Sequence, residues 1–201
     1  MNPIQVAASY DLIASDWTSP SFDQSNGIKQ HELAIGFALR KGAALDVGCG
    51  SNDRFLRLLR SHGFLVEGLD LSSEMLSLAR AANPQHIFYH ADICDWTVPK
   101  AYDFISAWDS IWHIPLHQQS SVLLKLCASL TPGGVFIFSA GGLETPDEHE
   151  NEFMGVPMYH ATLGVPRILS LLHEGACALR HFEYDQQSQS HVYFIAQRNK
   201  S

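Results

Sequence analysis

A glycine-rich segment, Asp-Val-Gly-Cys-Gly-Ser-Asn-Asp at residues 46–53, separates a short apolar run from an amphipathic stretch. The apolar run over 43–47 predicts a buried strand, and the stretch over 52–61 predicts a helix. Glycines at 48 and 50 permit a tight turn and let a ligand approach the backbone without meeting a Cβ. The start of the next helix offers free N–H donors to an anionic or polar group. The segment therefore predicts a strand–loop–helix unit with a ligand at the loop.

The same alternation of strand and helix continues along the chain. Further strands are predicted at 64–69, 86–90, 103–107 and 135–140, and further helices at 72–82, 115–130 and 166–174, with a turn at 131–134. Alternating strands and helices indicate parallel βαβ units with right-handed crossovers. The last two strands, 177–184 and 191–197, are separated only by the polar stretch 185–190, which is too short for a crossover helix. We therefore expect an antiparallel hairpin at the end of a mostly parallel sheet.

Two regions lie outside this alternation. Apolar residues at helical spacing predict helices at 3–18 and 26–40. The long connection 141–163 contains the acidic sequence Glu148–Glu152, which we interpret as a solvated face. Long connections inside compact domains are often active-site lids. We therefore expect one domain over 1–201, with lid helices at 1–40 and a lid or substrate-binding insertion at 141–163.

Composition limits the partners of the chain. It has 13 Lys and Arg against 21 Asp and Glu, so its formal net charge is −8. An acidic surface without a basic patch argues against nucleic acid as a partner. The N-terminal residues lack the basic and apolar segments of a signal peptide, and no apolar run is long enough to span a membrane. We expect a cytoplasmic protein, monomeric or homodimeric, with reduced thiols at Cys49, Cys94, Cys127 and Cys177.

Carboxylates follow the second and third predicted strands. Asp70 can accept hydrogen bonds from both hydroxyls of a ribose, because a carboxylate is an acceptor-only group. Asp92 can accept from an adenine amino group, and Ile93 can pack on the purine face. The glycine loop is a poor match to a dinucleotide site, because Asp53 occupies the position of the third glycine in G-x-G-x-x-G. Asp46, Asp70 and Asp92 also have plain structural interpretations, as loop-capping, helix-start and turn residues.

Three segments in this order resemble the motifs of class I S-adenosylmethionine (SAM)-dependent methyltransferases. They are Leu-Asp-Val-Gly-Cys-Gly at 45–50, Gly-Leu-Asp-Leu-Ser at 68–72 and Ala-Asp-Ile-Cys-Asp-Trp at 91–96. Segments 102–115 and 130–138 are similar to the fourth and fifth strands of that family, so the resemblance extends from about Tyr10 to the C-terminus. It implies a Rossmann-like three-layer α/β/α sandwich, whose seven-stranded sheet has the order 3-2-1-4-5-7-6 and an antiparallel last strand.

The resemblance also implies roles for individual residues. Cofactor-binding residues would be Asp46 at the SAM amino group, Gly48, Gly50, Ala107 and Trp108 along the methionine, Asp70 at the ribose, Leu71, Asp92 and Ile93 at the adenine, and Tyr10 and Trp17 on a lid helix. Substrate contacts are expected from Asp109, Trp112, Tyr159 and His160. Trp108, Trp112 and Tyr10 could stabilise the sulfonium cation through their ring faces.

His113 has two possible roles. It could act as a general base toward the acceptor, or it could position the helix that follows it. His113 and His117 are four residues apart, but Pro115 lies between them and no suitably spaced acidic ligand follows. We therefore expect no metal site.

Asn52 departs from the family pattern, in which most members have glycine two positions beyond the last motif glycine. Asparagine tolerates a positive φ better than most residues, so we expect the loop to keep its shape. The favoured prediction is methyl transfer from SAM to an O, N, S or C atom of a small-molecule acceptor. A SAM-binding protein of the same fold without catalysis and an NAD-dependent Rossmann enzyme remain as alternatives.

Overall fold

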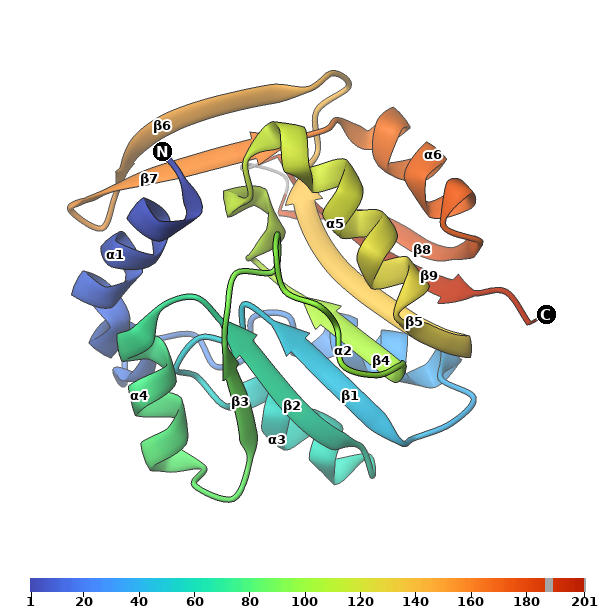
Figure 1. Cartoon of the computed structure of the whole chain (residues 1–201), viewed down its shortest axis with the longest axis horizontal. Helices are drawn as coiled ribbons and strands as arrows, with labels where there is room; N and C mark the ends of the chain where they lie inside the picture. The colour runs from blue at the N-terminus through green and yellow to red at the C-terminus, as the bar shows by residue number, and fades with distance from the viewer. Residues whose placement is uncertain (187–189, 201) are drawn as a thin grey trace.

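The computed structural model describes residues 1–186 and 190–200, and a seven-stranded sheet forms its centre (Figure 1). The strands are β1 (Ala43–Val47), β2 (Leu65–Asp70), β3 (Ile87–His90), β4 (Tyr102–Ala107), β5 (Leu130–Gly141), β8 (Cys177–Gln186) and β9 (His191–Arg198). Their order is β3-β2-β1-β4-β5-β9-β8. β9 runs antiparallel to β5 and β8, and the pairs from β3 to β5 are parallel. Because β8 and β9 are the sixth and seventh strands of this sheet, the predicted fold and strand order are confirmed.

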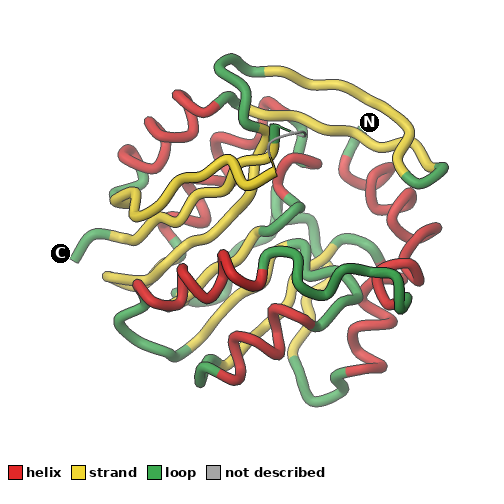
Figure 2. The backbone as a smooth tube through the Cα atoms, turned by 180° about the vertical axis from the view of Figure 1, so that it is seen from behind, coloured by secondary structure: helices red, strands yellow, loops and turns green. Residues whose placement is uncertain are grey.

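Helices cover both faces of the sheet, as the opposite views in Figures 1 and 2 show. They are α1 (Pro3–Ile13), α2 (Ile28–Phe37), α3 (Arg54–Ser61), α4 (Ser73–Ala82), α5 (Leu116–Ala128) and α6 (Val165–Glu174), with short 3₁₀ helices at Ala14–Thr18 and Ile111–His113. The predicted helix 3–18 is thus an α-helix followed by a 3₁₀ turn. None of these helices is long and apolar enough to cross a membrane.

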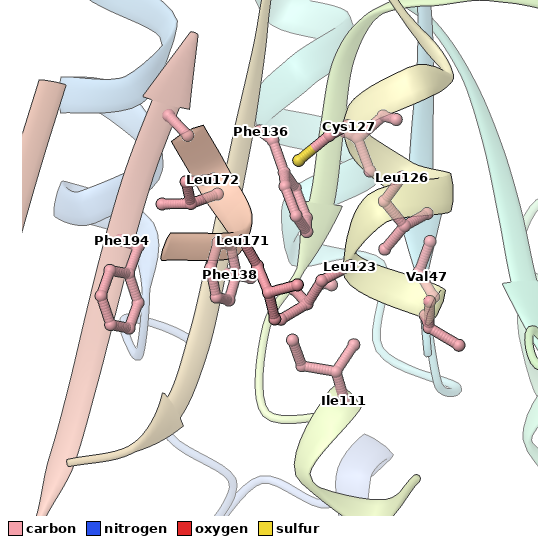
Figure 3. Packing of buried hydrophobic residues seen from close by; sticks show 14 of the residues in the cluster. Val47, Ile111, Leu123, Leu126, Cys127, Phe136, Phe138, Leu171, Leu172 and Phe194 are labelled. Atoms are coloured by element: carbon pink, nitrogen blue, oxygen red, sulfur yellow. The ribbon is translucent and has the colours of Figure 1, made fainter. Parts of the chain in front are cut away.

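Alternating side chains of the strands form two cores. On β5, Phe136 and Phe138 face α5 and α6, whereas Val135 and Ile137 face α2 and α3. The phenyl rings of Phe136 and Phe138 stack at 4.5 Å, and Phe194 of β9 continues the stack at 5.0 Å from Phe138. Figure 3 shows these rings among the leucines of α5 and α6. Strands buried on both faces are continuously apolar, which is why they were recognisable in the sequence.

Residues 141–163 contain two strands that the sequence analysis did not predict. β6 (Asp147–Phe153) and β7 (Val156–Thr162) form a separate antiparallel pair. All seven residues of β6 are exposed, so its sequence lacks the alternation of apolar and polar residues that marks a half-buried strand. The acidic segment Glu148–Glu152 is solvated, as expected. Figure 1 shows the pair outside the central sheet and close to the N-terminus, where the Met1 ammonium bonds Glu150.

Two turns also differ from the prediction. Residues 131–134 belong to β5, where Gly133 adopts a φ of +81° and the pairing with β4 shifts register. The polar stretch 185–190 begins inside β8, which extends to Gln186. Its residues 187–189 lie outside the described part of the chain.

Lys125 of α5 fixes the loop that follows β3. Its ammonium donates hydrogen bonds to the backbone carbonyls of Ile93 (2.7 Å), Cys94 (2.9 Å) and Trp96 (3.1 Å). A single side chain therefore satisfies three carbonyls of the segment that carries Asp92 and Ile93.

Replacing Lys125 with Met should lower the free energy of unfolding by about 2 kcal/mol, because three half-buried carbonyls lose a charged donor. Urea denaturation of the variant measures the loss. Lys29→Met, at an exposed position on α2, is the matched control and should be close to neutral. Equal stability of the Lys125 variant and the wild type would contradict this account.

Candidate functional site

A cavity of about 420 Å³ opens at the carboxyl ends of β1, β2 and β4. Ligands of open α/β sheets bind at this edge, where loops from adjacent strands meet. The cavity brings together most of the residues predicted for the site: Tyr10, Trp17, Gly48, Gly50, Asp70, Leu71, Asp92, Ile93, Trp108, Asp109, Trp112, His113 and His160.

Three predicted residues do not line this cavity. Asp46 is buried behind the glycine loop, where desolvation raises the pKa of its carboxyl to about 7 against the hydrogen bond from Ser106 and the charge of Arg54. Ala107 is fully buried in β4. Tyr159 turns away, because its hydroxyl donates to Glu148 at 2.5 Å and accepts from the backbone N–H of Leu116 at 3.0 Å. Direct ligand contacts by these three side chains stay predictions.

The glycine loop is held against the end of β2. The backbone N–H groups of Gly48 and Cys49 donate to the carbonyl of Leu69 at 2.7 and 3.0 Å. Gly48 adopts a φ of +71°, and a Cβ there would lie 2.3 Å from the Cβ of Ser110. Only glycine fits this position, so the loop passes close beneath the cavity with its backbone exposed to a ligand.

Asp70 connects this loop to the start of α4. Its carboxylate accepts hydrogen bonds from the backbone N–H groups of Gly50 (2.8 Å) and Ser72 (2.9 Å), one at each oxygen. Burial raises the pKa of Asp70, and these hydrogen bonds act in the opposite direction. Each oxygen keeps a further lone pair, so the carboxylate can accept two hydroxyl donors from the cavity. One carboxylate oxygen of Asp92 accepts a hydrogen bond from the backbone N–H of Cys94 at 2.8 Å.

The N-terminal segment forms the opposite wall and is tied to the site at several points. The carboxylate of Asp11 accepts from the Ser72 hydroxyl at 2.5 Å and from the Glu74 N–H at 3.0 Å, so it caps α4 from a different element. The Ser51 hydroxyl donates to the carbonyl of Ala14 at 3.1 Å. On the other side, the Ser9 hydroxyl donates to Pro157 of β7 at 2.6 Å. These bonds hold α1 between the loops and the β6–β7 hairpin.

Asn52 belongs to the same set of contacts. Its amide donates to the carbonyl of Trp17 at 3.0 Å and accepts from the N–H of Arg54 at 3.0 Å. Its φ is not positive, unlike those of Gly48 and Gly50. The loop therefore keeps its shape without a left-handed backbone conformation at Asn52. Asn52 instead bridges the N-terminal segment to the start of α3.

Both ring nitrogens of His113 are occupied. Nδ1 donates to the Tyr159 carbonyl at 2.7 Å, and Nε2 accepts from the indole N–H of Trp112 at 2.9 Å and from the Tyr10 hydroxyl at 2.8 Å. Since an indole N–H can only donate, Nε2 carries no proton. Burial lowers the pKa of His113 to about 3. This arrangement favours the positioning role over the general-base role, and it fixes Tyr10 above the cavity.

The other two histidines of the cavity differ from His113. His191 lies between two carboxylates, with Nε2 3.0 Å from Asp109 and Nδ1 2.5 Å from Asp185. Burial acts to lower the pKa of His191, but these hydrogen bonds outweigh it and raise the pKa. His160 lies 4.9 Å from the His113 ring, and its Nδ1 is buried without a partner among the described residues.

Sequence reasoning missed several residues of the cavity. They include Asn26, Arg54, Phe153 and His191. Arg54 begins the helix directly after the glycine loop, so its position was a usable signal. Asn26, Phe153 and His191 come from segments far apart in the sequence, and no local pattern connects them to the loop.

Comparison with known proteins identifies the family. A family model described as a methyltransferase domain matches residues 29–176, which include the glycine loop, Asp70 and Asp92. The chain belongs to this methyltransferase domain family. The methyltransferase domain is 27% identical over 139 residues to a dTDP-3-amino-3,6-dideoxy-α-D-glucopyranose N,N-dimethyltransferase from Streptomyces fradiae, covering 66% of the chain and 52% of that protein. It is 40% identical over 93 residues to a trans-aconitate 2-methyltransferase from Methylobacterium radiotolerans, covering 46% of the chain and 35% of that protein.

Solved structures share the fold of the methyltransferase domain. A S-adenosylmethionine-dependent methyltransferase from Clostridium acetobutylicum superposes with a TM-score of 0.72 at 15% identity, over 94% of this chain and 99% of that one. A SAM-bound amino pentose methyltransferase from Micromonospora echinaspora superposes with a TM-score of 0.70 at 15% identity, over 94% of this chain and 97% of that one. The chain spans about half the length, or less, of the curated relatives it matches first.

Replacing Asn52 with Gly should destabilise the methyltransferase domain, although glycine is the usual family residue. The variant loses the bonds to Trp17 and Arg54 and gains backbone freedom, so the free energy of unfolding should fall by about 1–2 kcal/mol. Chemical denaturation measures the change, with Asn199→Gly near the C-terminus as control. An increase in stability would show that the bridge contributes nothing.

The ion pairs of His191 predict a pH dependence of stability. A raised folded-state pKa gives stability that is complete below the unfolded-state pKa and is lost as pH rises through the folded-state pKa. The stability difference between wild type and His191→Gln should therefore be larger at pH 6 than at pH 9. His31 and His113 have lowered pKa values, but both residues are present in the wild type and in the variant. Their contributions to the pH dependence therefore cancel in the stability difference. A pH-independent difference would contradict a charged His191.

Proposed function

We propose that this domain transfers a methyl group from S-adenosylmethionine to a small-molecule acceptor. The observation that carries the proposal is the position of Asp70 beside the glycine loop. Its two carboxylate oxygens are each fixed by one backbone N–H and each keep a lone pair toward the cavity. This is the acceptor geometry that a ribose diol requires.

The rest of the cavity fits the same cofactor. Asp92 and Ile93 lie beyond Asp70 on the β3 side, where an adenine would extend from the ribose. Gly48, Trp108 and Asp109 lie on the β4 side, where the amino-acid end would lie. Bound SAM would supply a methyl group already activated on a sulfonium sulfur. The structures of similar fold include SAM-dependent and SAM-bound methyltransferases, which supports the assignment.

The acceptor would enter between the N-terminal segment and the β6–β7 hairpin. Aromatic residues from both contribute to this part of the cavity: Tyr10, Trp17, Phe22 and Phe153, together with Trp112. Their role would be to exclude water and align the acceptor with the methyl group, because alignment is the main requirement of such a transfer. We propose that α1 and the hairpin act as the lid predicted from the sequence. The bonds of Ser9 and Asp11 would have to open for ligands to enter.

The activities named for the relatives support a small acceptor. They include a sugar N,N-dimethyltransferase, trans-aconitate 2-methyltransferases and ubiquinone biosynthesis O-methyltransferases. These acceptors differ in chemistry, so the acceptor atom of this domain stays open. The net charge of −8 is consistent with a small-molecule substrate rather than a nucleic acid.

Calorimetry with S-adenosylhomocysteine tests the proposal. The wild type should bind it with micromolar affinity, and Asp70→Ala should reduce the affinity at least about 100-fold, because two charged hydrogen bonds to the ribose are lost. Asp147→Ala, at an exposed position on β6, is the control and should bind as the wild type does. Absence of binding to the wild type would refute the function. Binding without methyl transfer to any of a broad panel of acceptors would favour a non-catalytic SAM-binding protein.

A further inference from the structure

Arg54 is a buried cation without an ion-pair partner. Its side chain begins α3 and is 9% exposed. The guanidinium lies 4.1 Å from the ring centroid of Phe55 and 5.1 Å from that of Phe22, and Nε donates to the carbonyl of Asn26 at 3.0 Å. No carboxylate in residues 1–186 and 190–200 forms a salt bridge with it. Two aromatic rings and one carbonyl thus hold the guanidinium in place, while the carboxylates of Asp46, Asp109 and Asp23 act on its charge from beyond salt-bridge distance.

A buried cation without a direct salt bridge is costly, and proteins normally pair such a group. Arg54 lines the cavity, and its terminal nitrogens have no hydrogen-bond partner among the described residues. The planar fork of a guanidinium matches the two oxygens of a carboxylate. A carboxylate on a ligand is therefore the partner that this site lacks.

A second unpartnered donor lies in the same wall. Trp108 is 3% exposed and lines the cavity, and its indole N–H is buried without a hydrogen-bond partner in the described part of the chain. Trp108 and Arg54 both pack against Phe55. That nitrogen is fully buried beside Gly27, so Trp108 offers its ring rather than its N–H group to a ligand.

Asn26 keeps a cation and an anion apart in this region. Its carbonyl accepts from Arg54, while its side-chain amide donates to Asp109 at 3.2 Å. Asp109 is also bound to His191 and to the Ser139 hydroxyl, so it does not pair with Arg54. This end of the cavity therefore holds the guanidinium of Arg54 and the carboxylate of Asp109, both bonded to Asn26. Their charges are opposite to those of the carboxylate and ammonium groups of an α-amino acid.

We propose that Arg54 binds the carboxylate of the amino-acid end of the cofactor, with Asp109 facing its ammonium group. This inference rests on the proposed function. Asp70 is the last residue of β2 and Asp109 follows β4, with β1 between these strands, so the two carboxylates are separated by about two strand spacings, roughly 10 Å. A ligand whose ribose lies on Asp70 and whose chain crosses the glycine loop ends at Arg54. The aromatic wall from α1 and the hairpin remains for the acceptor.

Two ligands separate this role from a general effect on the site. S-adenosylhomocysteine carries the amino-acid end, whereas 5′-methylthioadenosine has the same nucleoside and thioether without it. Calorimetry on the wild type should show tighter binding of S-adenosylhomocysteine. Arg54→Met should weaken S-adenosylhomocysteine about 10- to 150-fold, as expected for loss of a charged hydrogen bond, and should change methylthioadenosine by less than about twofold. Arg54→Lys should recover part of the affinity.

Arg57→Met is the matched control on the same helix, because Arg57 is exposed and pairs only with Asp53. It should leave both affinities unchanged.

Wild-type protein that binds the two ligands equally well would overturn the proposal without any variant. Unchanged S-adenosylhomocysteine binding by Arg54→Met would overturn it as well and would leave a carboxylate of the acceptor as the remaining partner. Equal weakening of both ligands would assign Arg54 a purely structural role. Failure of the wild type to bind either ligand would refute the proposed function instead.

Discussion

The carboxylate of Asp70 is the interaction on which the site depends. Its two oxygens hold the backbone of the glycine loop at Gly50 and the start of α4 at Ser72, so one side chain fixes the loops after β1 and β2 relative to each other. The carbonyl of Leu69 reinforces the arrangement through Gly48 and Cys49. A parallel sheet brings these loops to one edge, but these bonds set their spacing. The group proposed to bind the ribose is therefore also the group that shapes its binding site.

The other wall of the cavity is built from elements that have little stability by themselves. A short helix such as α1 and a two-stranded pair such as β6–β7 are marginal in isolation. They hold each other through buried contacts of Val6 and Ile13 with β7 and through the hydrogen bond from Ser9 to Pro157, while Asp11 ties α1 to the start of α4. Such weakly held elements are the ones that proteins use as lids, because little free energy is needed to open them.

Three histidines in one cavity have three different environments. His113 has both ring nitrogens hydrogen-bonded, His191 lies between two carboxylates that raise its pKa, and His160 keeps a buried ring nitrogen without a partner in the described residues. The residue type alone does not distinguish these cases, because each depends on groups contributed by other elements. Proton transfer from an acceptor would need a ring nitrogen that is open to the cavity, and both ring nitrogens of His113 are already hydrogen-bonded.

The sequence by itself determined the strands of the sheet, because strands buried on both faces are continuously apolar, and the family resemblance of the motifs at 45–50, 68–72 and 91–96 implied their order. It also placed Asp70, Asp92 and the glycines, whose roles depend on their own strand ends. Only the tertiary structure decided that residues 141–163 contain a hairpin, that Asn52 bridges to Trp17, and that Arg54 is buried without a salt bridge to any described residue. These features arise from contacts between distant segments, and a residue's local sequence carries no information about the partner that folding brings to it.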